Sequence, residues 1–262
     1  AIQSYLALVR SQLLAFFRSK QALFWSLAFP LGFLFLFGGI MARGNPRAAT
    51  FMLPGLLTTM IISGSLFGIA MPMVLAREKG ILRRFRVTPI SASTMILAHG
   101  TTAVFQNAIT FALLLTVSRF VFKTEIAGSL PALAVVFLFG AFSTIPLGLL
   151  VGSAAKDMES APPIINLIFF PMMFLSGSAF PFALLPEAMK SFARFLPATY
   201  IVESLQGVIV RGEGLSLLIG PLAILTVLGL TGLALSAALF RWEGTEPISK
   251  RSIATILGAF VV

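Results

Sequence analysis

The chain has 262 residues, of which 58% are hydrophobic and 11% are charged, with a formal net charge of +10 and a mean hydropathy of +0.99. Soluble domains contain about 45–50% apolar and about 25% charged residues, so this composition excludes a water-soluble enzyme. Cysteine is absent and His99 is the one histidine, so we expect no disulfide framework and no metal site.

Six segments of 22 to 32 residues lack Asp, Glu, Lys and Arg. A helix of about 20 residues crosses a hydrocarbon core about 30 Å thick. Backbone groups find no partners in lipid, and strict alternation of polar and apolar residues is missing, so helices are favoured over a barrel. The sequence predicts one all-α membrane domain over 1–262 with six transmembrane helices. The predicted spans are 21–42, 51–76, 100–118, 130–153, 161–180 and 215–240.

The loops between these spans differ in positive charge. Twelve Lys and Arg residues fall on the side of the two termini, and seven fall on the other side. Because cytoplasmic loops carry the excess of Lys and Arg, both termini are predicted to be cytoplasmic. The basic charge is therefore attributed to membrane orientation and anionic lipid headgroups, and we expect no nucleic-acid partner.

Residues 1–20 have the pattern of an amphipathic helix that lies in the headgroup plane without crossing the membrane. One face is polar and carries Arg10 and Arg18. Two interpretations remain open: the helix is a surface anchor, or its polar face also docks against the cytoplasmic loop that follows the second span. The apolar face is formed by Ile2, Tyr5, Leu6, Val9, Leu13, Phe16 and Phe17.

The loop after the second span predicts a short cytoplasmic helix over 77–89, ended by Pro89. A loop that only fixes topology needs scattered cations, whereas this segment also presents an apolar face of Ile81, Leu82 and Phe85. That face needs lipid headgroups or a protein partner to cover it. Glu78 has two interpretations of equal weight: a carboxylate at a helix N-terminus, or an ion pair with the first helix.

The predicted spans contain no ionisable side chain, which disfavours an ion channel or a proton-driven transporter. A few residues of the second and fifth spans are spaced to line one apolar cavity. Such a cavity suits a hydrophobic or amphipathic substrate, while ordinary helix packing is the alternative. These substrate-path residues are Thr59, Ser63 and Phe67 in the second span, and Asn166, Phe169, Phe170 and Met173 in the fifth.

Prolines interrupt the chain between the fifth and sixth spans. Pro186 and Pro197 are suited to open short helices over 186–195 and 198–210, because proline is favoured at the first helical position. Helices of this length dip into the outer leaflet or cap the bundle, and an ordinary extracellular loop is the alternative. The residues that define the hairpin are Gly177, Phe180, Pro181, Pro186, Pro197 and Tyr200.

Two motifs resemble the type-2 ABC exporter permeases. They are Arg-Glu-Lys-Gly-x-Leu-x-x-x-x-x-Thr-Pro-Ile-Ser at 77–91, and Ser-Gly-x-x-Phe-Pro-x-x-x-Leu-Pro at 176–186 with Leu-Pro-x-x-Tyr at 196–200. The resemblance implies that 77–89 is a coupling helix in a groove of a cytoplasmic ABC ATPase subunit. The residues implied to couple to the ATPase are Arg77, Glu78, Lys79, Gly80, Leu82, Arg83, Arg84, Phe85, Arg86, Thr88 and Pro89.

The resemblance also implies the rest of the assembly. Residues 1–20 would be the connecting helix, with Glu78 bridging to it. Residues 181–211 would form an extracellular re-entrant hairpin, and residues 241–262 would form a cytoplasmic tail. Two ATPase copies would hold ATP and Mg, and a second permease copy or a paralogue would complete a dimer in a bacterial or archaeal cytoplasmic membrane. The chain itself lacks Gly-Lys-Ser/Thr, so no Walker A loop cradles a nucleotide here.

Export of a drug, natural product or lipid-like molecule is the leading interpretation. A polysaccharide or lipid-linked glycan exporter and a non-transporting membrane scaffold are the alternatives. An intramembrane enzyme would need a nucleophile and a base or metal ligands, and His99 alone does not supply them.

Overall fold

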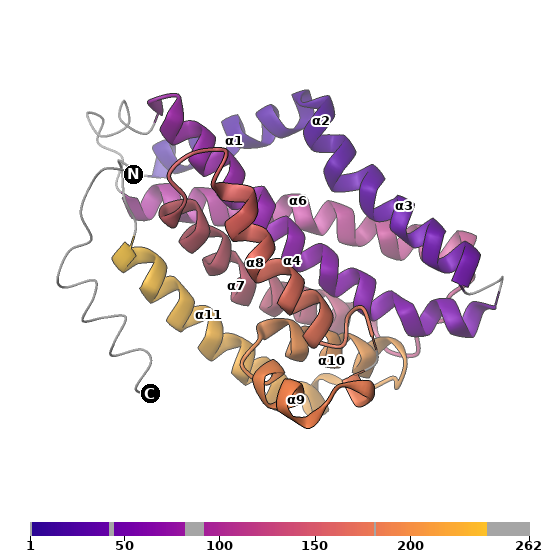
Figure 1. Ribbon diagram of the computed structural model, residues 1–262. Helices are drawn as coiled ribbons and strands as arrows, with labels where there is room; N and C mark the ends of the chain where they lie inside the picture. The colour runs from indigo at the N-terminus through magenta and orange to yellow at the C-terminus, as the bar shows by residue number, and fades with distance from the viewer. Residues whose placement is uncertain (1, 42–44, 82–91, 181, 240–262) are drawn as a thin grey trace.

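The computed structural model describes residues 2–41, 45–81, 92–180 and 182–239, and within these ranges the chain is helical with no strand (Figure 1). The all-α prediction is confirmed. The α-helices are α1 (Ile2–Arg18), α2 (Lys20–Leu23), α3 (Phe29–Phe35), α4 (Pro46–Glu78), α6 (Ala92–Val121), α7 (Leu130–Ala154), α8 (Ala161–Leu175), α9 (Glu187–Ala193), α10 (Pro197–Ile209) and α11 (Ile219–Leu239). Two π-helical segments, η1 (Phe24–Ala28) and η2 (Leu36–Met41), flank α3, and two 3-10 turns are η3 (Phe182–Leu184) and η4 (Leu215–Leu218).

Four helices are long and apolar enough to cross a membrane: Pro46–Glu78, Thr94–Val121, Leu130–Ala154 and Leu215–Ala237. They correspond to the second, third, fourth and sixth predicted spans. The third predicted span, 100–118, lies within α6, which extends beyond both ends of it from Ala92 to Val121. The first and fifth predicted spans contain shorter apolar helices, Ser26–Phe35 and Ala161–Leu175.

Helix α7 is the centre of the bundle. In its most apolar stretch of 18 residues, 61% of the residues are buried, whereas the corresponding stretch that includes α11 is 22% buried. Thr144, Gly148 and Gly152 recur every four residues on the face that meets α4. The Thr144 and Ser65 hydroxyls are hydrogen bonded at 2.8 Å, and a methyl group added at Gly148 would strike the Ser65 carbonyl oxygen. Small residues thus let the two backbones approach closely, as in membrane helix pairs.

Helix α11 packs on the opposite face of α7. Gly232 lies against Pro146, and the Ser236 hydroxyl donates a hydrogen bond of 2.9 Å to the Pro146 carbonyl oxygen. Helix α10, although only 13 residues long, is buried among α4, α7 and α11. The segment after the fifth span therefore contributes a core helix as well as a surface hairpin.

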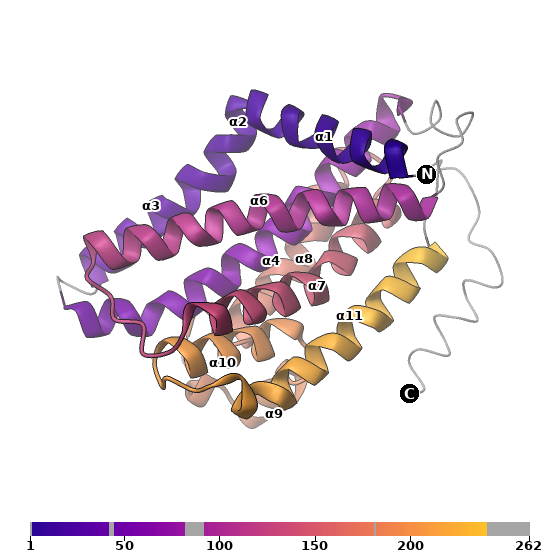
Figure 2. The same ribbon diagram turned by 180° about the vertical axis from the view of Figure 1, so that it is seen from behind.

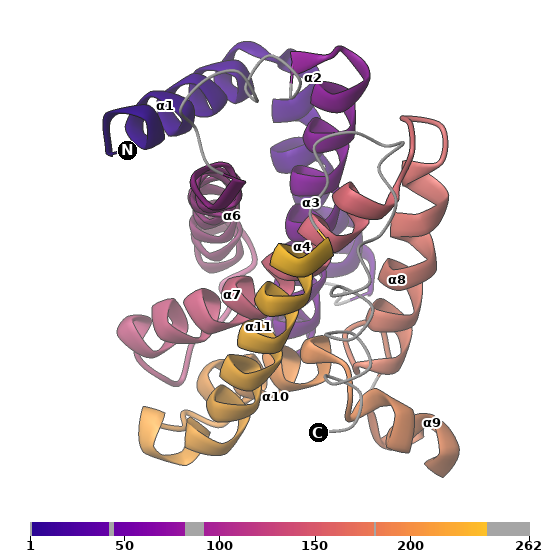
Figure 3. The ribbon, with the colours of Figure 1, turned by 90° about the vertical axis from the view of Figure 1, so that its left-hand side faces the viewer.

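The N-terminal segment 2–41 runs along α6 in two stages (Figures 2 and 3). Helix α1 crosses the first half of α6 obliquely, and the Tyr5 and Thr101 hydroxyls are hydrogen bonded at 2.7 Å. The segment 20–41 then accompanies the second half, since Thr110 donates to the Ser26 carbonyl oxygen and Gly38 lies against Phe122.

The packed face of α1 differs from the predicted apolar face. Leu8 and Phe16 are its buried residues, and the Tyr5 hydroxyl bonds α6 on the same stripe. Ile2 and Phe17, which the periodicity placed on the apolar face, remain exposed. Hydrophobic periodicity does not distinguish a face that packs on another helix from one that is left for lipid, so the interfacial placement of this helix stays a prediction.

Candidate functional site

The end of α4 meets the end of α7 through the side chain of Arg77. Its two terminal N–H groups donate to the carbonyl oxygens of Ala155 and Gly152, each at 2.6 Å. The last carbonyls of a helix lack partners within that helix and carry its negative dipole end, so a guanidinium is well suited to cap them. Gly152 also lets the α7 backbone approach Ala70 and Met73 of α4. Arg77 therefore caps α7 from the neighbouring helix.

The adjacent carboxylate holds the turn between α7 and α8. Glu78 Oε1 accepts a hydrogen bond of 2.7 Å from the backbone N–H of Met158. Both earlier interpretations of Glu78 were wrong: it lies at a helix C-terminus, and its hydrogen-bond partner in the structure is this turn and not the first helix. A carboxylate is unfavourable beside the negative end of a helix, and the Met158 N–H compensates for that position.

The turn itself is closed by its own side chains. Asp157 Oδ1 accepts from the Ser160 N–H at 2.8 Å, and Ser160 Oγ accepts from the N–H groups of Lys156 and Asp157, each at 3.2 Å. Hydrogen bonds from the side chain and backbone of Ser160 lower the pKa of the Asp157 carboxyl below its ordinary value. The turn thus offers Glu78 a fixed N–H donor.

The helix predicted over 77–89 does not begin at Arg77, because α4 continues through Glu78. Lys79 and Gly80 then form a C-terminal cap in which their N–H groups donate to the carbonyls of Leu75 and Arg77. Gly80 has φ +65°, a left-handed conformation that glycine adopts without a steric penalty. The remaining predicted coupling residues, Leu82, Arg83, Arg84, Phe85, Arg86, Thr88 and Pro89, lie outside the described residues.

The predicted connecting helix does not contact Glu78 in the structure. Arg10 and Arg18 are exposed on α1, and the part of the chain that the structure describes shows no hydrogen bond or ion pair for either side chain. Helix α1 packs on α6 instead. The guanidinium groups of Arg10 and Arg18 are thus left on the surface of α1.

Two of the predicted substrate-path residues, Phe67 and Phe169, are in contact where α4 packs against α8. The rings of Phe67 and Phe169 are in edge-to-face contact with centroids 5.9 Å apart, and Phe170 continues the contact from Phe169 at 5.6 Å. Aromatic pairs prefer such offset geometries. The contacts extend from Phe170 to Phe174 and on to Phe180, so one row of rings follows α8 into the hairpin.

The polar residues of the predicted substrate path make no hydrogen bond between α4 and α8 in the described part of the chain. The hydroxyls of Thr59 and Ser63 donate to carbonyl oxygens of their own helix, those of Gly55 and Met60. Asn166 and Met173 are half-buried on α8. The shared face is therefore mainly aromatic and aliphatic, with internally satisfied hydroxyls. An apolar recess at Leu34, Gly38, Ala49, Met52, Leu53 and Leu56 includes none of the predicted path residues.

The hairpin helices begin where the prolines predict. Pro186 is the N-cap of α9, and Pro197 is the first residue of α10. Thr199 and Tyr200 of α10 donate to the carbonyl oxygens of Ala193 and Arg194 at 2.6 Å and 2.8 Å, so the hydroxyls of one helix cap the end of the other. Gly177 (φ +89°) forms the turn after α8, Phe180 is exposed, and Pro181 lies outside the described residues.

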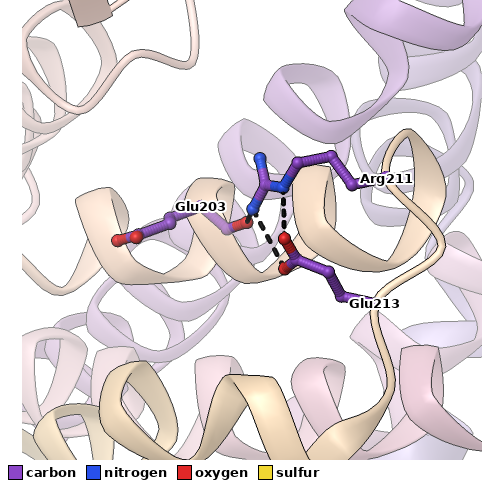
Figure 4. A network of polar contacts seen from close by, with 3 residues as sticks. All are labelled: Glu203, Arg211 and Glu213. Atoms are coloured by element: carbon purple, nitrogen blue, oxygen red, sulfur yellow. Dashed lines mark hydrogen bonds and ion pairs between the residues drawn. The ribbon is translucent and has the colours of Figure 1, made fainter.

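A polar network closes the far end of α10 (Figure 4). Arg211 Nε donates to Glu213 Oε1 at 2.6 Å, while its Nη2 donates to Glu213 Oε2 at 3.2 Å and to the Glu203 carbonyl oxygen at 3.3 Å. Hydrogen bonding to Arg211 lowers the pKa of the Glu213 carboxyl and raises that of the guanidinium. Gly212, at φ +68°, makes the tight turn between the two charged residues.

Several contacts that shape this site were not predicted from the sequence. The capping of α7 by Arg77 joins positions 75 and 78 residues apart, and no local pattern reveals it. The Asp157–Ser160 turn did have a local signal, because Asp and Ser three residues apart before an apolar run commonly cap a helix start.

In comparisons with known proteins, residues 3–210 match the family described as ABC-2 type transporter. The chain is 24% identical over 213 residues to the inner membrane transport permease YhhJ of Escherichia coli, a match that covers 80% of this chain and 52% of YhhJ. It is 28% identical over 174 residues to a protein named "Probable multidrug ABC transporter permease YbhS" from the same species, covering 64% of this chain and 46% of YbhS. ABC transporter G family member 20 of Dictyostelium discoideum is 22% identical over 174 residues, which are 66% of this chain and 24% of that protein. The chain thus spans about half the length of the first two of these relatives.

Proposed function

Because this chain belongs to the ABC-2 type transporter family and is a multi-pass membrane permease, we propose that it moves a hydrophobic or amphipathic molecule out across the cytoplasmic membrane. The family match over 3–210 carries this proposal, since it includes both the segment after α4 and the hairpin. Energy would come from a separate ATPase subunit that binds ATP and Mg. Two ATPase copies and a second permease, either an identical chain or a paralogue, would complete the exporter.

The ATPase would dock on the segment that follows α4. Helix α4 runs for 33 residues directly into this segment, and the left-handed Gly80 redirects the chain just past its end. The segment combines the cations Arg83, Arg84 and Arg86 with the apolar residues Leu82 and Phe85. An amphipathic segment attached to a long helix offers a surface that a soluble subunit can bind, and movement of that segment would move the attached helix.

The substrate would pass along the face shared by α4 and α8. Phe67, Phe169 and Phe170 give this face an aromatic lining, and the Thr59 and Ser63 hydroxyls are already bonded to their own helix. A lining with few free polar groups favours apolar over strongly hydrated molecules. The rings are phenylalanines and not the Trp or Tyr that sugar-stacking sites favour, which speaks against a glycan substrate.

The proposed setting is a bacterial or archaeal cytoplasmic membrane. Both termini would be cytoplasmic, because the loops on their side carry twelve of the nineteen Lys and Arg residues. The ends of α4, α7 and α11 lie toward the same end of the bundle as the start of α1, which supports one common side for these segments (Figures 1 and 2).

The test is purification of the full-length protein from its native host in mild detergent, followed by mass spectrometry and an ATPase assay. We expect an ABC ATPase subunit in stoichiometric amount. The double variant Arg83→Ala/Arg84→Ala should lower its recovery by at least about tenfold, the effect of roughly 1.4 kcal/mol of lost binding free energy.

The matched control removes two exposed cations from the predicted outer side. Arg47→Ala/Arg194→Ala should leave ATPase recovery unchanged, because both exposed side chains would face the side of the membrane opposite the ATPase. A wild-type protein that purifies without any ATPase would contradict the exporter proposal and favour a membrane scaffold. Equal losses in both double variants would instead mean that net charge, and not a docking segment, retains the ATPase.

A further inference from the structure

Arg77 and Glu78 hold three helix ends together within this chain. Arg77 reaches from α4 to the last carbonyls of α7, and Glu78 reaches to the turn that starts α8. Two neighbouring residues therefore fix α4 to both of the helices that meet at this end. The resemblance of the 77–91 motif to type-2 ABC exporter permeases implied, in contrast, that these two residues contact the ATPase.

Apolar side chains also pack together at this junction. Val74 of α4 is buried with Ala155 and Ala161, the residues that end α7 and begin α8. Met158 and Ile164 pack against the same cluster. A displacement of the end of α4 therefore cannot leave the start of α8 behind without exposing this cluster and breaking the Glu78–Met158 hydrogen bond.

The turn that receives Glu78 is closed by hydrogen bonds of its own. Asp157 and Ser160 close it with hydrogen bonds of 2.8 Å and 3.2 Å, and α8 begins at the next residue, Ala161. Along α8, Phe169 then contacts Phe67 of α4. The two helices are thus joined at the polar turn and again about two turns of helix further on.

We propose that Arg77 and Glu78 form an intramolecular clamp that transfers movement of the 79–89 segment to α8, and that neither residue contacts the ATPase. They are positioning residues for the face shared by α4 and α8. The inference rests on the proposed function, because the movement it transfers would come from ATP binding in the docked subunit. It assigns the motif's first two residues to contacts within the permease and the cations that follow to the partner.

The test follows α8 directly and needs no known substrate. The chain has no native cysteine, so Pro163→Cys places a single thiol at an exposed position in the first turn of α8, beside the charged turn at 156–159. In the purified complex, we expect Mg-ATP with vanadate to change the rate at which a maleimide dye labels this thiol. Glu78→Ala should reduce that change at least fivefold while ATPase recovery and basal ATP hydrolysis stay within twofold of wild type.

Two companion variants separate a clamp from a merely structural role. Glu78→Gln keeps an amide oxygen that can accept the Met158 N–H, so it should retain at least half of the labelling change. Glu159→Ala removes an exposed carboxylate one residue from Met158 and should behave as wild type. A thermal unfolding curve for each variant checks that it is folded.

Three results would overturn the clamp. One is a full labelling change in Glu78→Ala, and another is loss of ATPase recovery in that variant, which would place Glu78 at the partner interface. The third is equal damage in Glu78→Gln and Glu78→Ala. Failure of the exporter proposal gives a different pattern, in which the wild-type protein recovers no ATPase and shows no labelling change.

Discussion

Individual charged residues in this chain act mainly on helix ends. Arg77 caps α7 from another helix, whereas Arg211 reaches the Glu203 carbonyl oxygen of α10 and pairs with Glu213 just beyond that helix. Gly152 is among the last carbonyls of α7, which that helix leaves without partners, whereas the Glu203 carbonyl lies within α10 and accepts Arg211 as an additional donor. The Glu203 carboxylate points away from Arg211, so only the Glu203 backbone joins the network (Figure 4).

The Arg211–Glu213 pair gives a pH-dependent prediction. The pKa of Glu213 is lowered by Arg211, so its contribution to stability is present above the ordinary glutamate pKa and is lost as the pH falls through the lowered value. Glu213→Gln should therefore unfold slightly more easily than wild type at pH 7, by the about 0.2–1 kcal/mol typical of exposed pairs.

Thermal unfolding in detergent at pH 7 and at acid pH measures this difference. The gap between wild type and Glu213→Gln should close in acid, because the carboxyl is then protonated in both the folded and unfolded wild-type protein. Glu203→Gln is the comparison variant and should have a smaller effect at pH 7, because its carboxylate acts on Arg211 through charge alone and not through a hydrogen bond. A difference in unfolding temperature between wild type and Glu213→Gln that widens in acid would contradict a stabilising role for the ionised Glu213.

At the level of elements, α4 and α8 form the pair most closely connected with the proposed function. They share the cluster in which Ile62 and Leu66 of α4 pack with Ile165 and Met172 of α8. The Phe67–Phe169 contact lies at the edge of this cluster, with both rings half-buried. One side of each ring is therefore available to a molecule that moves along this face.

We predict that Phe169→Ala lowers export of apolar dyes several-fold, because it removes the ring that joins Phe67 to Phe170. ATPase recovery should stay at the wild-type level, since the docking segment is unchanged. Fluorescence loss from energised cells loaded with a panel of apolar dyes measures export. Phe105→Ala, which removes a 49% exposed ring on α6, is the control. Equal export of every dye by Phe169→Ala and wild type would remove this face from the substrate path.

For the whole molecule, the number of membrane crossings depends on the two shorter apolar helices, of which α8 is the longer. This helix has only 15 residues, but it runs antiparallel to α4, with Met158 at Glu78 and Ser178 against Gly55. Gly55 and Glu78 are 23 residues apart, which is about 34 Å of helix at about 1.5 Å per residue. Because the hydrocarbon core is about 30 Å thick, α8 and its flanking turns have the reach of a full crossing.

Single cysteines in this cysteine-free chain test that crossing. We predict that a membrane-impermeant maleimide labels Glu125→Cys and Glu187→Cys in intact cells, and labels Lys156→Cys only after permeabilisation. All three side chains are exposed in the structure. Labelling of positions 156 and 187 from the same side would mean that α8 does not cross, and Glu125→Cys controls for the reagent.

The sequence by itself determined the all-helical membrane fold, the central spans and the starts of α9 and α10. Those features depend on local causes: long charge-free runs have to be helical in lipid, and proline is favoured at the first position of a helix. The fourth span was predicted within one residue, since Ser129 caps its start and the charged turn at 156–159 follows its end.

The tertiary structure alone decided what the side chains touch. Glu78 lies beside Met158 and Arg77 beside Gly152 because α4 and α7 pack closely through glycines, a contact between positions about 80 residues apart. The packed stripe of α1 was fixed in the same way by α6. Hydrophobic periodicity shows that a face is apolar, but the choice between lipid, a neighbouring helix and a partner is made by packing between distant segments.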